Sequence, residues 1–172
     1  MRLYLAGKIG KGDWRHGIVR GLRGAFCDGD EVPKGILKNA IFGEHDYCGP
    51  FFVSCDHGCG HGSNSHGVGL NGAPCIGPSY SRLEISDACM YGVQHSEAVF
   101  AWIESTDCHG TLFELGVAHG IGLPIGIGFS PEVKRTRDLW LMSEQADFVA
   151  TPNIRTAEEC LRTYINTLNY VT

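Results

Sequence analysis

Apolar runs alternate along the chain with stretches whose apolar residues recur at helical spacing. The runs at residues 3–7, 97–103 and 124–128 contain almost no charged side chains, which is typical of strands buried on both faces of a sheet. Shorter strands are predicted over 36–42, 47–53 and 147–150. The helical pattern predicts helices over about 14–22, 81–94, 111–120, 135–145 and 156–168.

This alternation of strands and helices predicts an α/β fold with a mostly parallel sheet and helices on both faces. We expect a single domain over residues 1–172, of the flavodoxin-like (Rossmann-like) doubly wound class, with five strands in its sheet. The strands at 3–7 and 97–103 should be central, so that the loops at their carboxyl ends lie close together. Ligands of such sheets bind at this edge, and functional residues are therefore expected there.

Residues 54–79 interrupt the pattern with a segment rich in Gly, His, Ser and Cys, which is too long for an ordinary connection and indicates a functional loop. Cys55, His57, Cys59 and His61 recur at every second residue, and both residue types are zinc ligands. Structural zinc sites, however, draw their ligands in pairs from separate turns. We favour a loop that covers substrate, without a bound metal; a zinc site and an unstructured surface loop are the alternatives.

Charge and composition exclude several classes of protein. The net charge is −5 and the basic residues are scattered, so no surface for nucleic acid or anionic membrane is expected. No apolar run approaches the roughly 18 residues of a membrane span, and the first strand begins without a signal-peptide pattern. We therefore expect a cytoplasmic protein whose eight cysteines are reduced.

The strand at 97–103 leads into a turn and a helix that carry two carboxylates, Asp107 and Glu114. Thr111 and Glu114 have the spacing of a capping box, which is a purely structural interpretation. The position at the sheet edge, the second carboxylate and the helix amino terminus, which favours an ionised carboxylate, support a catalytic role instead. Paired carboxylates serve glycosyl transfer, in which one attacks the sugar carbon and the other handles protons.

The same turn carries a family resemblance. Residues 107–118 follow the pattern Asp-x-x-Gly-Thr-x-x-Glu-Leu-Gly-x-Ala, and residues 3–9 form an apolar strand that runs into a glycine loop. Together with the apolar strand at 99–103, these segments resemble the nucleoside 2-deoxyribosyltransferase family. The resemblance covers residues 1–10 and 96–128 and is weaker around 139–147.

The resemblance implies a retaining reaction without a cofactor, on a small-molecule nucleoside or nucleotide. Glu114 matches the nucleophile, which attacks the anomeric carbon, expels the base and forms a glycosyl ester that another base or water then releases. Tyr4 matches a tyrosine whose hydroxyl positions that carboxylate. Asp107, or Cys108 beside it, matches the residue that binds the sugar hydroxyls.

Further substrate contacts are expected from the two loops at the sheet edge. The expected residues are Gly7 and Lys8 in the first loop and Cys108, His109, Gly110 and Thr111 in the second. Trp140 and Met142 match residues that family members supply to the site of a neighbouring subunit, which implies a homo-oligomer. Core packing explains these two residues equally well.

The chain departs from the family at Cys89, where the family has an aspartate that helps to protonate the departing base. Asp87 lies two residues away, about 200° around a helix, and so faces elsewhere. Cleavage of the N-glycosidic bond is therefore a firmer expectation than transfer to a second base. The alternatives are a nucleoside 5′-monophosphate N-glycosidase, in which Lys8 meets the phosphate, and a nucleotide-binding sensor domain without turnover.

Overall fold

The computed structural model describes residues 1–9, 14–22, 35–50, 82–133, 139–151 and 153–171. These residues form an α/β fold around a sheet of six strands in the order β2-β3-β1-β4-β5-β6. The strands are β1 (Arg2–Ala6), β2 (Leu37–Ile41), β3 (His45–Tyr47), β4 (Ala98–Ile103), β5 (Ile125–Phe129) and β6 (Phe148–Val149). Neighbouring strands are parallel except for β2 and β3, so the sheet is mostly parallel, as the sequence predicts.

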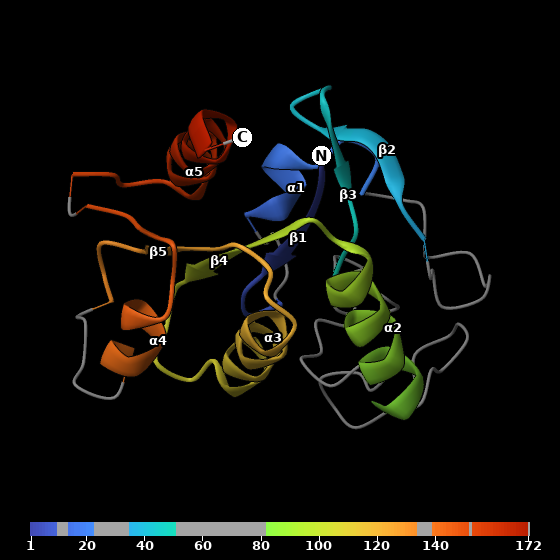
Figure 1. Cartoon of the computed structure of the whole chain (residues 1–172), viewed down its shortest axis with the longest axis horizontal. Helices are drawn as coiled ribbons and strands as arrows, with labels where there is room; N and C mark the ends of the chain where they lie inside the picture. Colours follow the sequence, from blue (N-terminus) through green and yellow to red (C-terminus); the bar gives the residue numbers. More distant parts are fainter. Residues whose placement is uncertain (10–13, 23–34, 51–81, 134–138, 152, 172) are drawn as a thin grey trace, which may run out of the picture.

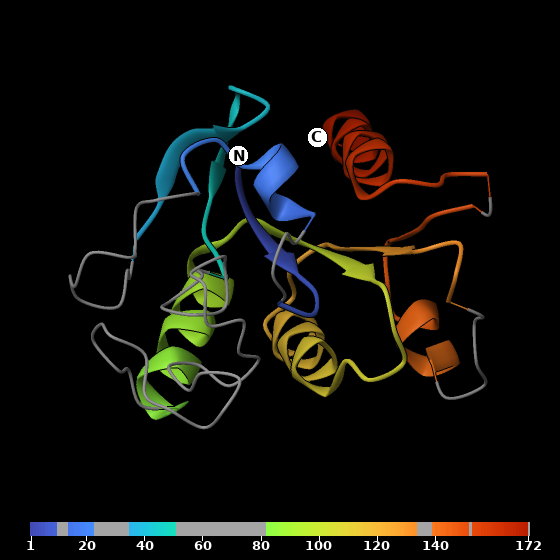
Figure 2. The same ribbon diagram turned by 180° about the vertical axis from the view of Figure 1, so that it is seen from behind.

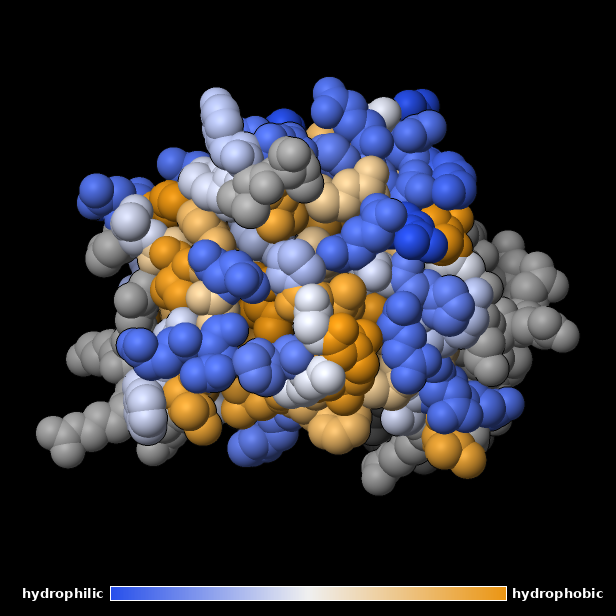
Figure 3. Space-filling model, in the orientation of Figure 1, coloured by the Kyte–Doolittle hydropathy of each residue, from blue (hydrophilic) through white to orange (hydrophobic). Residues whose placement is uncertain are grey.

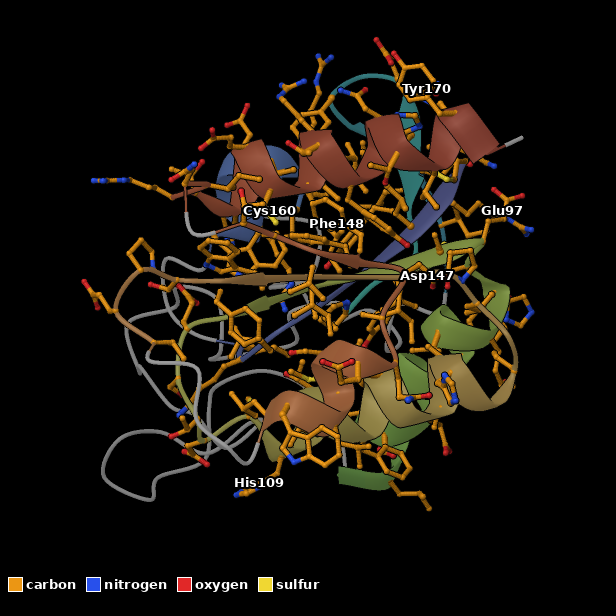
Figure 4. The ribbon with its side chains drawn as sticks, turned by 60° about the vertical axis from the view of Figure 1, so that its left-hand side comes forward. Glu97, His109, Asp147, Phe148, Cys160 and Tyr170 are labelled. Atoms are coloured by element: carbon orange, nitrogen blue, oxygen red, sulfur yellow. The ribbon has the colours of Figure 1, made fainter. Side chains whose placement is uncertain are left out.

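The helices lie in two layers, one on each side of the sheet. They are α1 (Arg15–Ile18), α2 (Arg82–His95), α3 (His109–Gly120), α4 (Trp140–Glu144) and α5 (Ala157–Val171). Helices α1 and α5 are on one side, and α2, α3 and α4 are on the other (Figures 1 and 2). The same separation is visible in Figure 4, where Cys160 and Tyr170 on α5 lie across the sheet from His109 at the start of α3.

Strands β1 and β4 form the centre of the sheet and are buried on both faces. All six residues of β4 are buried, which explains why its sequence is a continuous apolar run. Along β1 the side chains alternate, so that Leu3 and Leu5 join the core on the α5 side while Tyr4 and Ala6 join the core on the α3 side. Leu3 pairs with Ala98 and Ala6 with Ala101, so the two strands end side by side.

The first half of the chain differs from the prediction in three respects. The sheet has six strands instead of five, since the strand predicted over 36–42 joins it as the antiparallel edge strand β2. The helix expected over 14–22 covers only Arg15–Ile18, since Val19 already forms a β-bridge with Ile41. The strand expected to begin at residue 47 begins at His45, because Phe42 and Gly43 take φ values of 55° and 78° and turn the chain earlier than expected; residues 51–53 of the expected range lie outside the described residues.

Gly92 allows α2 to lie directly against β1, and we expect its replacement to destabilise the fold. A methyl group at this position would overlap the carbonyl oxygen of Cys48 and lie 2.9 Å from the Tyr4 ring. The variant Gly92→Ala should therefore lower the free energy of unfolding by about 1–3 kcal/mol, although alanine favours helices. Urea denaturation measures the change. The matched control is Gly116→Ala on α3, where a methyl group meets nothing within 4 Å, and an equal response of both variants would contradict this packing.

Candidate active site

The candidate site lies at the carboxyl ends of β1 and β4. Because these strands are parallel neighbours, the loop after Ala6 and the turn after Ile103 meet at one edge of the sheet, as predicted. A pocket of about 490 Å³ opens there, between α2, α3 and the first loop. Its lining residues are Gly7, Lys8, Ile9, Ile85, Ser86, Cys89, Met90, Asp107, Cys108, His109, Gly110, Thr111, Phe113 and Glu114.

Tyr4 and Glu114 form a hydrogen bond in the wall of this pocket. The Tyr4 hydroxyl donates a hydrogen bond of 2.5 Å to Oε1 of Glu114, across 110 positions of the sequence. Tyr4 is fully buried and does not line the pocket, so it holds the carboxylate from behind, while Glu114 itself faces the pocket. The expected pairing of these two side chains is therefore present.

Helix α3 begins earlier than predicted, and this changes the surroundings of Glu114. The first helical residue is His109, and the residue that precedes it, Cys108, makes no capping hydrogen bond with its side chain. Thr111 is therefore inside the helix, and the capping box predicted for Thr111 and Glu114 is wrong. Glu114 lies beyond the first turn and is partly buried among side chains.

Burial decides the charge of Glu114. Loss of water raises the pKa of its carboxyl group to about 7, although the Tyr4 hydrogen bond and the positive charge of Arg15 both act to lower it. The helix amino terminus was expected to favour the ionised carboxylate, but Glu114 lies beyond the first turn of α3 and burial outweighs this effect. Glu114 is half ionised near neutral pH, and it gains or loses a proton over the range in which many enzymes work.

Tyr4 and Cys89 both keep their protons. Burial, followed by the charge of Glu114, raises the pKa of the Tyr4 hydroxyl well above its ordinary value. The same two causes raise the pKa of the Cys89 thiol to about 11, although a hydrogen bond with Tyr4 acts to lower it. Tyr4 is therefore a permanent hydrogen-bond donor, and Cys89 faces the pocket as a neutral thiol. Asp87 is exposed and does not line the pocket, as its position on the helix predicts.

The mouth of the pocket is polar and carries an ion pair. The Lys8 ammonium lies 2.9 Å from Oδ2 of Asp107, and Nε2 of His109 lies 3.8 Å from Oδ1 of the same carboxylate. The hydrogen bond from Lys8 and its charge lower the pKa of Asp107. All three side chains are largely exposed, so this ion pair adds little to stability and its groups are accessible to a ligand.

Eight residues that the sequence placed in the site line this one pocket. They are Gly7, Lys8, Asp107, Cys108, His109, Gly110, Thr111 and Glu114. Sequence reasoning missed the apolar part of the lining, which consists of Ile9, Ile85, Met90 and Phe113. Four lining residues come from α2, and their spacing could have revealed them. Ile85 and Cys89, and likewise Ser86 and Met90, lie four residues apart and so share one face of the helix.

Trp140 and Met142 lie on α4 and do not reach this pocket within one chain. Met142 lines a second, apolar pocket of about 310 Å³ between α3 and α4, whereas Trp140 is 60% exposed. Leu141 between them is also largely exposed, and hydrophobic residues reach the surface across the middle and left of this face (Figure 3). Simple core packing therefore does not explain Trp140.

The predicted metal-binding candidates cannot be placed. Cys55, His57, Cys59 and His61, with the whole segment 54–79, lie outside the described residues. Within the part of the chain that the structure describes, no group of three or more His, Cys, Asp or Glu side chains could hold a metal ion. Cys48, Cys89, Cys108 and Cys160 are free thiols.

Comparisons of the chain with protein-family models, with curated proteins and with solved structures give no match. None of the described helices is both long and apolar enough to cross a membrane.

Proposed function

We propose that the chain is a nucleoside 2-deoxyribosyltransferase-like enzyme, which cleaves the N-glycosidic bond of a nucleoside or deoxynucleoside. The observation that carries this proposal is the 2.5 Å hydrogen bond between the buried Tyr4 hydroxyl and Glu114 at the inner end of the pocket. A tyrosine that cannot ionise fixes one oxygen of the carboxylate and leaves the other to attack. The five parallel strands follow the order β3-β1-β4-β5-β6, which supports a flavodoxin-like, doubly wound assignment.

In the proposed reaction, the Glu114 carboxylate attacks the anomeric carbon of the sugar. A carbon–oxygen bond forms, the carbon–nitrogen bond breaks, and its electron pair leaves with the base, which takes up a proton from water. The covalent glycosyl ester is then attacked by water or by a second base, and the Glu114 carboxylate is regenerated. Two displacements at one carbon retain its configuration.

The charges at the pocket mouth favour a nucleoside over its 5′-monophosphate. Lys8 is the only basic residue with a permanent charge among the described lining residues, and it is already paired with Asp107 at 2.9 Å. A phosphate would have to compete with this carboxylate and would be repelled by it. Sugar hydroxyls can instead accept a hydrogen bond from Lys8 and donate one to Asp107 without breaking the pair.

We further propose a homo-oligomer in which α4 contributes to a neighbouring chain. The exposure of Trp140 and Leu141, at 60% and 58%, supports this proposal, since large apolar side chains on a surface often mark an interface. Light scattering measures the oligomeric state, and a monomer at all concentrations would contradict it.

The experiment that tests the function is incubation with a panel of ribo- and deoxynucleosides and their 5′-monophosphates, with and without a free acceptor base. We expect release of the base from at least one nucleoside, faster than from its monophosphate, and a new nucleoside if transfer occurs. The products are separated by chromatography. Faster cleavage of the monophosphate, together with its selective loss in Lys8→Ala, would favour the hydrolase of nucleotides instead. Tight binding without any base release would favour a sensor domain.

A further inference from the structure

Arg15 is a fully buried arginine behind the candidate site. It belongs to the short helix α1, which lies on the α5 side of the sheet, across β1 from α2 and α3 (Figure 1). Its guanidinium lies over the ring of Trp14, at 4.7 Å from the ring centre. A buried charge is costly unless dipoles or opposite charges face it, so its surroundings indicate what it does.

The guanidinium holds the end of β1 that supports the pocket. Nε donates a hydrogen bond of 2.6 Å to the carbonyl oxygen of Leu5, and Nη2 donates one of 2.8 Å to the carbonyl oxygen of Gly7. Gly7 itself lines the pocket, and a methyl group there would lie 2.8 Å from Nη2 and 2.9 Å from the carbonyl oxygen of Trp102. Arg15 therefore packs tightly against the backbone at the point where β1 and β4 end.

The charge of Arg15 also reaches the pocket side of the sheet. It lowers the pKa of Glu114 and of the Cys89 thiol, so it opposes the effect of burial on both groups. Among the described residues, the other ionisable groups around Glu114 are Tyr4 from β1 and Cys89 from α2, and at the pocket mouth Lys8, Asp107 and His109. Tyr4 and Cys89 stay neutral, and within the described part of the chain Arg15 is the cation whose charge lowers the pKa of both Glu114 and Cys89.

We propose that Arg15 is a positioning residue for this site, whose buried guanidinium fixes the backbone of Gly7 and stabilises the negative charge of Glu114. The proposal rests on the proposed function in one respect, namely that ionised Glu114 is the attacking group. A protonated carboxyl group is a poor nucleophile. The guanidinium keeps its charge throughout the accessible pH range, so it favours the ionised form at every pH.

The test compares Arg15→Met, which removes the charge, with Arg15→Lys, which keeps it. In Arg15→Met we expect the acidic limb of the pH profile of kcat/KM to shift to higher pH by about one unit. The shift follows because the positive charge that favours ionised Glu114 has been removed. Activity should therefore fall roughly tenfold at pH 6.5 and recover at alkaline pH. In Arg15→Lys the limb should stay in place. Equal, pH-independent losses in both variants would overturn the proposal, since they indicate a structural role alone.

Arg20→Met is the matched control, because Arg20 is exposed and its loss should leave the pH profile unchanged.

A second measurement uses the unaltered protein and so does not depend on the folding of an Arg15 variant. The ¹⁵N NMR signal of Arg15 Nε should move with a midpoint near pH 7, the pKa of about 7 that Glu114 has, and should not move in Glu114→Gln. If the chemical shift of Arg15 Nε does not change as Glu114 titrates, the proposal is overturned. Because the titration needs no substrate, it decides the role of Arg15 separately from the nucleoside panel, on which the proposed function depends.

Discussion

Glutamine in place of Glu114 is expected to reduce base release by about 10³-fold or more, because an amide has no negative charge with which to attack the anomeric carbon. The shape of the side chain is kept, and its carbonyl oxygen can still accept the hydrogen bond that Tyr4 donates to Oε1 in the unaltered protein. The initial rate of base release from the best nucleoside of the panel, measured at pH 8, gives the result.

Glu132→Gln provides the matched control, since Glu132 is exposed and does not line the pocket. Its rate should equal that of the unaltered protein. A second variant, Glu114→Ala, leaves space beside the sugar. Added azide should then attack the anomeric carbon in place of the carboxylate and give a glycosyl azide of inverted configuration. A rate in Glu114→Gln close to the original one would exclude Glu114 as the nucleophile.

The same Glu114→Gln variant is expected to be more stable than the original protein at alkaline pH. The folded chain holds the Glu114 proton with a pKa of about 7, whereas the ordinary value is 4.5. The folded state therefore binds more protons than the unfolded state between these two values. Its free energy of unfolding falls as the pH rises through this window, by about 3 kcal/mol in total. Glutamine does not ionise and avoids this loss.

Urea denaturation of both proteins at pH 4.5 and pH 8 measures this effect. The two free energies of unfolding should be similar at pH 4.5. At pH 8 the free energy of unfolding of the variant should exceed that of the original protein by about 3 kcal/mol. Glu132→Gln should show no pH-dependent difference. Parallel stability curves for Glu114→Gln and the original protein would mean that the carboxyl group is not buried as the structure has it. Combined with lost activity, the expected gain separates a catalytic defect from misfolding.

The central elements were predictable because each depends on a local signal that tertiary contacts reinforce. Strand β4 is apolar throughout since both of its faces are buried. The helix predicted from residue 156 begins with Thr156-Ala157-Glu158-Glu159, which is typical of a capping box, and the Thr156 hydroxyl accepts a hydrogen bond of 3.2 Å from the Glu159 N–H. Ligands of parallel sheets bind at the carboxyl ends of the central strands. Since β1 and β4 were expected to be central, this rule predicted where the pocket lies.

The rest depends on contacts that a sequence pattern does not contain. The apolar side chain of Leu83 on α2 is 70% exposed, and helical periodicity alone does not tell which turns of a helix pack against the sheet. Thr111 and Glu114 match a capping box, but the helix starts at His109. Arg15 has the appearance of a solvent-exposed residue at a helix start, yet its side chain reaches back to the carbonyl groups of β1.

The long sequence separation between Tyr4 and Glu114 has a consequence for the newly made protein. Their hydrogen bond joins residues 110 positions apart, and β1 pairs in the folded chain with β4, the strand that leads into α3. During synthesis from the amino terminus, the pocket therefore cannot form until the middle of the chain has left the ribosome. Closing such a large loop is slow relative to forming a helix or a hairpin. A ligand that binds this pocket consequently recognises only chains whose central strands have already paired, and it stabilises those chains against unfolding.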